Sequence, residues 1–183
     1  QTLDELMKNA DLAMYEAKDQ GRNRHAFFTA AMDIRANYRL ELETSLRRAF
    51  EHGELELHYQ PRLTLATNEI IGAEALLRWQ HPSRGMIPPT EFVPVAEDAG
   101  LVEPIGEWVM LTAAEQQRRW LESGHQLSMA VNVSAKQFHN EALIRKIDSI
   151  MAKAACDPQS LELEITESML MGNASSTIEI LQA

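Results

Sequence analysis

The sequence is poor in cysteine and has no long apolar run, and each absence excludes a class of protein. Cys156 is the only cysteine in the 183 residues, so neither an intramolecular disulfide framework nor a cysteine-based zinc site is possible. We therefore expect a reducing, cytoplasmic compartment. No apolar stretch approaches the roughly 18 residues of a membrane-spanning helix. The amphipathic pattern of the first residues is not that of a signal peptide.

Positive charge is also scarce. The sequence has 17 Lys and Arg residues and 27 Asp and Glu residues, which gives a formal net charge of -10. This charge repels the phosphate backbone of a long nucleic acid, so polymeric DNA or RNA is not an expected partner. A small anionic ligand is compatible with it, because a metal ion or an arginine reverses the field inside one cleft. Hydrophobic residues make up 45% of the chain, which is typical of a globular protein with a sizeable core.

Several catalytic signatures are missing from the sequence. There is no glycine-rich phosphate loop of the GxGxxG or GxxxxGK type, which argues against a nucleoside triphosphate or nicotinamide dinucleotide site. The six histidines show no HExxH spacing, and no serine lies in a GxSxG context. A histidine-based zinc enzyme and a serine hydrolase of the α/β type are therefore unsupported.

Apolar periodicity divides the chain into three parts. Residues 1–28 begin on a helix start without an initiating Met, which suggests a piece of a longer polypeptide, and they predict a helix followed by a short strand over residues 25–28. Residues 29–53 predict a connecting helix, either a signalling linker or an ordinary amphipathic helix packed on its own domain. In residues 54–183 a strand pair precedes alternating helices and strands, a pattern typical of an α/β barrel or a doubly wound sheet.

Three predicted strands carry polar side chains where a buried parallel strand is normally apolar. Glu74 interrupts the first, Asn132 lies inside the second, and Glu162 and Glu164 alternate with leucines in the third. If the strands are neighbours, Glu74, Asn132 and Glu164 converge, and oxygen ligands of this kind suit Mg²⁺ or Mn²⁺. Arg78 shares a strand face with Glu74 and is a candidate partner for a phosphate. A hydrogen-bonded core amide, a solvated acidic face and a surface ion pair are the alternative explanations.

Five motifs occur along the second part of the chain: YQP at 59–61, EALLRW at 74–79, PTEFVP at 89–94, NVS at 132–134 and EITES at 164–168. In this order they resemble the N-terminal part of the EAL-domain cyclic di-GMP phosphodiesterases. The first part, with NADLAMYEAK at 9–18 and GRNR at 21–24, resembles the last helix and strand of a GGDEF domain. The parent protein is therefore similar to tandem GGDEF-EAL signalling proteins, in which sensory domains or a membrane anchor can lie upstream.

The resemblance implies a TIM-like α/β barrel, only about the first half of which is present, with an early antiparallel strand and the active site at the carboxyl ends of the strands. The implied reaction is the hydrolysis of cyclic di-GMP to linear pGpG with two Mg²⁺ or Mn²⁺ ions. Three groups of residues match functional positions of the family: the metal ligands Glu74, Asn132 and Glu164; the dinucleotide contacts Gln60, Leu77 and Arg78; and Glu167, which matches a glutamate that steadies an active-site loop.

The chain also departs from the family pattern. The Asp-Asp-Phe-Gly-type motif and the later Lys, Glu and Gln of the family are absent, as is the GGDEF tetrad itself. We therefore expect this chain alone to be inactive. Half a barrel exposes a strand edge, which favours a homodimer or a strand-exchanged oligomer. A degenerate EAL domain that binds cyclic di-GMP without hydrolysing it is the alternative function, and a scaffold that dimerises through the connecting helix is a third.

Overall fold

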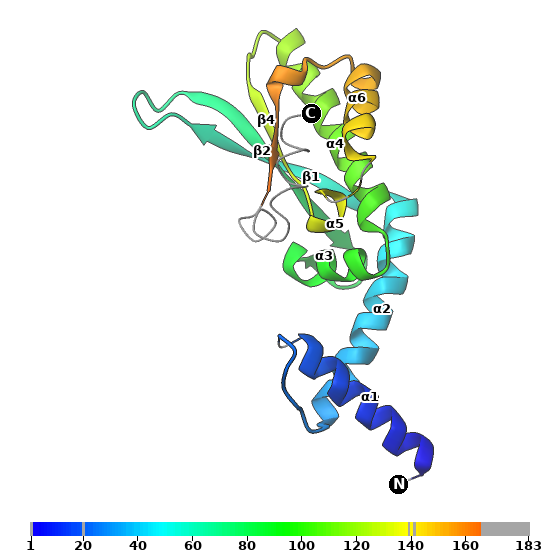
Figure 1. Ribbon diagram of the computed structural model, residues 1–183. Helices are drawn as coiled ribbons and strands as arrows, with labels where there is room; N and C mark the ends of the chain where they lie inside the picture. Colours follow the sequence, from blue (N-terminus) through cyan, green and yellow to red (C-terminus); the bar gives the residue numbers. More distant parts are fainter. Residues whose placement is uncertain (1, 20, 139, 141, 166–183) are drawn as a thin grey trace. The chain divides into compact units, whose positions relative to one another are not determined.

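The computed structural model describes residues 2–19, 21–138, 140 and 142–165 (Figure 1). The chain divides into two compact units, Gln1–Leu46 and Arg47–Ala183. Within the described residues, no helix is both long enough and apolar enough to cross a membrane. The elements, in chain order, are α1 (Leu3–Asp19), α2 (Ala30–His52), β1 (Leu55–Leu63), β2 (Ile70–His81), β3 (Gly85–Ile87), α3 (Pro89–Asp98), α4 (Val102–Glu122), β4 (Ser128–Asn132), α5 (Ala135–Phe138), α6 (Leu143–Ala154), the 3-10 turn η1 (Pro158–Ser160) and β5 (Leu161–Glu164).

The first unit contains α1 and most of α2. A capping box starts α1, because Glu5 N donates to Thr2 Oγ1 at 3.2 Å while Thr2 N donates to Glu5 Oε2 at 2.9 Å. An ion pair of 3.0 Å between Arg35 and Glu16 joins the two helices. Local capping, charged contacts and the burial of apolar side chains such as Ala13, Ala17 and Met32 therefore organise this small unit.

The strand predicted over residues 25–28 is wrong. Residues 25–29 form neither helix nor strand, and the Phe27 side chain is 81% exposed. A strand requires a hydrogen-bonded neighbour, and no described segment pairs with these residues. The helix that precedes them was correctly predicted, but the strand prediction depended on a partner that the described chain does not supply.

The second unit is built on a mixed sheet with the strand order β1-β2-β4-β5, and β3 pairs with β2 outside this path. β1 runs antiparallel to β2, as the sequence led us to expect, while β2, β4 and β5 are parallel neighbours. Among the described strands, β1 and β5 end the sheet and do not pair with each other. The sheet is therefore partial and not closed.

One face of this sheet is apolar and packs against helices. Ala73, Ala75 and Trp79 of β2 alternate with the polar positions of that strand and are buried, as are Met129 and Val131 of β4. α4 contacts β4 and α6, and α3 contacts β2 (Figure 1). The helices therefore cover one face, and the opposite face carries the polar side chains.

Candidate functional site

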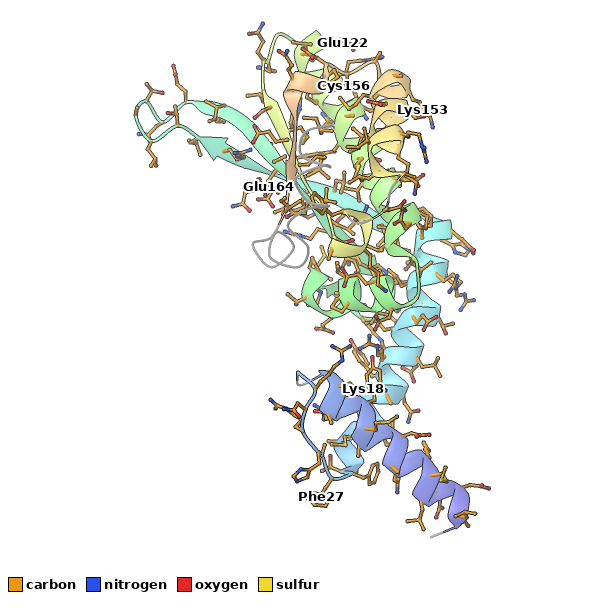
Figure 2. All side chains as sticks on the ribbon, in the orientation of Figure 1. Lys18, Phe27, Glu122, Lys153, Cys156 and Glu164 are labelled. Carbon is orange, nitrogen blue, oxygen red and sulfur yellow. The ribbon has the colours of Figure 1, made fainter. Side chains whose placement is uncertain are left out.

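The polar face of the sheet brings predicted site residues from four strands into register. Gln60 of β1 lies opposite Glu74 of β2, and Asn132 of β4 lies opposite Glu164 of β5. The side chains of Glu74 and Asn132 meet directly, because Asn132 Nδ2 donates to Glu74 Oε1 at 2.7 Å. Figure 2 shows Glu164 at the end of β5, away from Cys156, which precedes that strand. The residues that the sequence predicted to converge thus come from neighbouring strands.

The donor set of this cluster fits a hard divalent cation. The Asn132 amide uses an N–H toward Glu74, which leaves the Asn132 carbonyl oxygen and the second Glu74 oxygen available for a ligand. Glu164 adds a half-buried carboxylate in the next strand. Carboxylate and amide oxygens are the ligands that Mg²⁺ and Mn²⁺ prefer. The described residues contain no cluster of three His, Cys, Asp or Glu side chains that could hold a metal, so the amide is a necessary part of this set.

Arg78 and Leu77 follow Glu74 on β2, toward the carboxyl end of this strand, and Asn132 lies at the carboxyl end of the parallel strand β4. Arg78 is half-buried, four positions from Glu74 on the same strand face, and its Nη1 donates to the carbonyl oxygen of Leu77 at 2.9 Å. Leu77 alternates to the other face and is also half-buried. Both residues line a pocket of about 400 Å³, so one wall of the pocket combines the positively charged Arg78 with the apolar side chain of Leu77.

The pocket lies among α3, α4, α5 and the ends of β2 and β4. Its apolar walls include Phe92 of α3 with Ile105 and Val109 of α4, and its polar groups include Arg78 and Asn132. A mostly apolar pocket with a few polar groups is the usual form of a small-molecule site. Since Asn132 belongs to both, the pocket adjoins the cluster of oxygen donors.

Gln137 is a pocket residue that the sequence analysis missed. Ser134 N donates to Gln137 Oε1 at 3.1 Å and Gln137 N donates to Ser134 Oγ at 3.3 Å, which is the reciprocal pattern of a capping box at the start of α5. A Cβ atom added at Gly106 would lie 1.8 Å from Gln137 Nε2, so a side chain there would displace the Gln137 amide from this arrangement. The S-x-x-Q spacing was the sequence signal for this cap. The cap fixes the chain directly after Asn132.

Arg62 and Glu162 are a second feature that the sequence analysis did not recognise as a pair. Arg62 Nη1 donates to Glu162 Oε2 at 2.5 Å. This hydrogen bond, followed by one from Ser128, lowers the pKa of the Glu162 carboxyl, and the bond to Glu162 raises the pKa of Arg62. The two residues are 100 positions apart, so only the three-dimensional fold brings them together.

Glu167, predicted to steady an active-site loop, lies outside the described residues, as does the end of the EITES motif. The described residues therefore place Gln60, Glu74, Asn132 and Glu164 on one face, and Leu77 and Arg78 on the adjoining pocket. The metal and substrate roles of these residues stay predictions.

A sequence model of the EAL domain matches residues 43–183, well over half of the chain. The chain belongs to the EAL domain family. It is 46% identical over all of its 183 residues to the bifunctional diguanylate cyclase/cyclic di-GMP phosphodiesterase MucR of Pseudomonas aeruginosa, of which it covers 27%. It is 37% identical, over 97% of its length, to the cyclic di-GMP phosphodiesterase PdeR of Escherichia coli, of which it also covers 27%.

Solved EAL structures have the same fold as this EAL chain. A MucR phosphodiesterase in complex with c-di-GMP superposes with a TM-score of 0.76 at 43% identity, over 78% of this chain and 58% of that one. The EAL domain of FimX from Pseudomonas aeruginosa bound to c-di-GMP superposes with a TM-score of 0.68 at 27% identity, over 78% of this chain and 57% of that one. The chain thus spans about a quarter of the length of these two curated relatives and somewhat more than half of each solved chain.

Proposed function

We propose that this chain is part of a metal-dependent cyclic di-GMP phosphodiesterase, and that the complete protein hydrolyses one phosphodiester bond of cyclic di-GMP to give linear pGpG. The hydrogen bond of 2.7 Å between Asn132 and Glu74 is the observation that carries this proposal, because it joins two motifs of the family in one donor set. Membership of the EAL family and the likeness to structures that hold c-di-GMP support it. We place the activity in a cytoplasmic part of the protein.

In this proposal the oxygen atoms of Glu74, Asn132 and Glu164 hold part of a site for two Mg²⁺ or Mn²⁺ ions. When bound, such ions activate water and stabilise the charge that develops on the phosphoryl oxygens. Asn132 orients the Glu74 carboxylate through its N–H and keeps its own carbonyl oxygen for the ions. The general base and the remaining ligands are supplied by segments that this sequence does not include.

The other proposed roles concern the dinucleotide. Arg78 pairs with a phosphate, and its hydrogen bond to the Leu77 carbonyl limits the positions that its guanidinium can take. Leu77 offers an apolar surface in the pocket to a base, and Gln60 contributes an amide from β1, opposite Glu74. Glu167, which lies outside the described residues, is proposed to steady an active-site loop.

We also propose the domain division that the motifs indicate. Residues 1–28 are the C-terminal remnant of a GGDEF domain, residues 29–53 are a connecting helix, and residues 54–183 are the first half of a TIM-like barrel. The outer edges of β1 and β5, which pair with no described strand, support a homodimer or strand-exchanged oligomer of the isolated chain.

The isolated 183-residue chain is expected to form no pGpG from cyclic di-GMP in the presence of Mg²⁺ or Mn²⁺, because its donor set is incomplete. The complete encoded protein is expected to form it under the same conditions. Chromatographic detection of pGpG with both proteins at equal concentration tests this. Product from the short chain would contradict the expected inactivity. Binding without product in the complete protein would favour the alternative, a non-catalytic cyclic di-GMP receptor.

Arg78→Ala in the complete protein is expected to weaken binding of cyclic di-GMP by about 10- to 150-fold. One charge-assisted hydrogen bond to a phosphate contributes about 1.5–3 kcal/mol, and each 1.4 kcal/mol corresponds to about tenfold in Kd. Calorimetric titration without divalent cations, where the proposed metal-dependent hydrolysis does not run, measures the change. Arg145→Ala on the exposed side of α6 is the matched control. An unchanged Kd for the Arg78 variant would remove Arg78 from the phosphate site.

A further inference from the structure

The ion pair between Arg62 and Glu162 joins the two end strands of the sheet. Arg62 lies on β1 and Glu162 on β5, with β2 and β4 between them. The intervening positions are small, because Arg62 lies opposite Gly72, and Glu162 lies opposite Ala130. A Cβ atom at Gly72 would lie 2.4 Å from the hydroxyl oxygen of Ser128. These small residues leave the polar face open enough for the two long side chains to meet.

Glu162 shares this face with the predicted metal ligands. It precedes Glu164 by two positions on β5, and its partner Ala130 is also the partner of Glu74. Beside Glu74 and Glu164, which the family pattern uses, Glu162 is a third carboxylate in this part of the face, while Glu56, opposite Arg78, lies further along β1. The Glu162 carboxylate is occupied by hydrogen bonds from Arg62 and Ser128.

The pair contributes little to folding stability. The side chains of Arg62 and Glu162 are 38% and 44% exposed, and ion pairs with this exposure are largely compensated by hydration. Arg62 also interacts electrostatically with Glu164 and Glu74. The position of its charge therefore matters more for the acidic cluster than for the stability of the unit.

We propose that Arg62 is a positioning residue that neutralises Glu162 and holds it away from the divalent-cation site formed by Glu74, Asn132 and Glu164. Without Arg62, the cluster gains a negative charge and a free carboxylate that competes for the cation. This inference rests on the proposed function of that cluster. It assigns a role to two residues outside the predicted ligand and substrate set.

The test is Mn²⁺ binding to the complete encoded protein without nucleotide, followed by electron paramagnetic resonance of the free ion. One unit of charge several ångströms from a divalent ion changes its affinity roughly fivefold. Arg62→Met is therefore expected to bind Mn²⁺ roughly fivefold more tightly and Glu162→Gln roughly fivefold more weakly. The matched control Arg62→Lys and the double variant Arg62→Met/Glu162→Gln keep the net charge and are expected to bind as the unchanged protein does.

Three results overturn the proposal while leaving the metal site itself in place. The first is that Arg62→Met binds Mn²⁺ no more tightly than the unchanged protein. The second is that the double variant binds Mn²⁺ as tightly as a tighter-binding Arg62→Met. The third is that Glu162→Gln binds Mn²⁺ with unchanged affinity. Thermal melting shows whether each variant is folded, and Glu162→Gln with Arg62→Lys decides the question if Arg62→Met does not fold. Failure of the unchanged protein to bind Mn²⁺ overturns the proposed metal site and this inference together.

Discussion

Glu74→Ala in the complete protein is expected to reduce the hydrolysis of cyclic di-GMP by at least about a hundredfold while retaining measurable binding of the nucleotide. Removal of a group that stabilises developing charge typically costs about 10²–10³ in rate. Glu74 also receives the Asn132 N–H, so its loss removes one ligand and the partner that orients another. Arg78 and the apolar pocket remain, which is why the nucleotide is still bound. Initial rates of pGpG formation and a binding titration measure the two effects separately.

Glu122→Gln at the exposed end of α4 is the matched control for this variant (Figure 2). It removes the same carboxylate charge from the unit but lies on the helical side of the sheet, and its ion pair with Arg118 is a surface contact. We expect its rate and its affinity to equal those of the unchanged protein. Normal turnover by Glu74→Ala would remove Glu74 from the metal site, and an equal loss in Glu122→Gln would show a nonspecific charge effect.

The positions of Glu74, Asn132 and Glu164 on one face could be predicted because strands alternate with a period of two and each residue interrupts an apolar pattern. What period two cannot give is the order of the strands. The sequence analysis had to assume that the three strands are neighbours, and the structure places β4 between β2 and β5. The resemblance to the EAL family supplied the antiparallel direction of β1, and the short turn between the two paired strands agrees with it.

The ion pair between Arg62 and Glu162 was not predictable in the same way. Arg62 has no local feature that distinguishes it from any charged residue in a strand, and its partner lies 100 positions away. Gln137 differs in this respect, because its cap with Ser134 is local and leaves the S-x-x-Q signature in the sequence. The strand predicted near Phe27 failed for the opposite reason. Its local pattern was favourable, but strand formation depends on a neighbour.

Trp79→Ala in this chain is expected to destabilise the second unit by about 3–5 kcal/mol, the usual cost of truncating a buried aromatic side chain. Trp79 has no exposed surface, its ring packs edge-on against Phe92 at 5.6 Å between centroids, and its Nε1 donates to Glu54 Oε2 at 3.2 Å. Truncation leaves a cavity between β2 and α3 and removes the donor to Glu54. Urea unfolding followed by tryptophan fluorescence measures the loss, since all three tryptophans lie in this unit.

Trp120→Ala is the matched control, because this tryptophan is only half-buried and its ring packs edge-on against Tyr59 at 5.2 Å. Less apolar area returns to water on its truncation, so a smaller loss of about 1–2 kcal/mol is expected. Trp79 also precedes β3 and α3 and directly follows Arg78. The cavity left by Trp79→Ala therefore loosens the pocket wall that carries the Arg78 guanidinium. We therefore expect Trp79→Ala, and not Trp120→Ala, to weaken cyclic di-GMP binding in the complete protein under conditions where both variants are folded. Equal affinities in the two variants would show that the packing of Trp79 supports the fold without positioning Arg78.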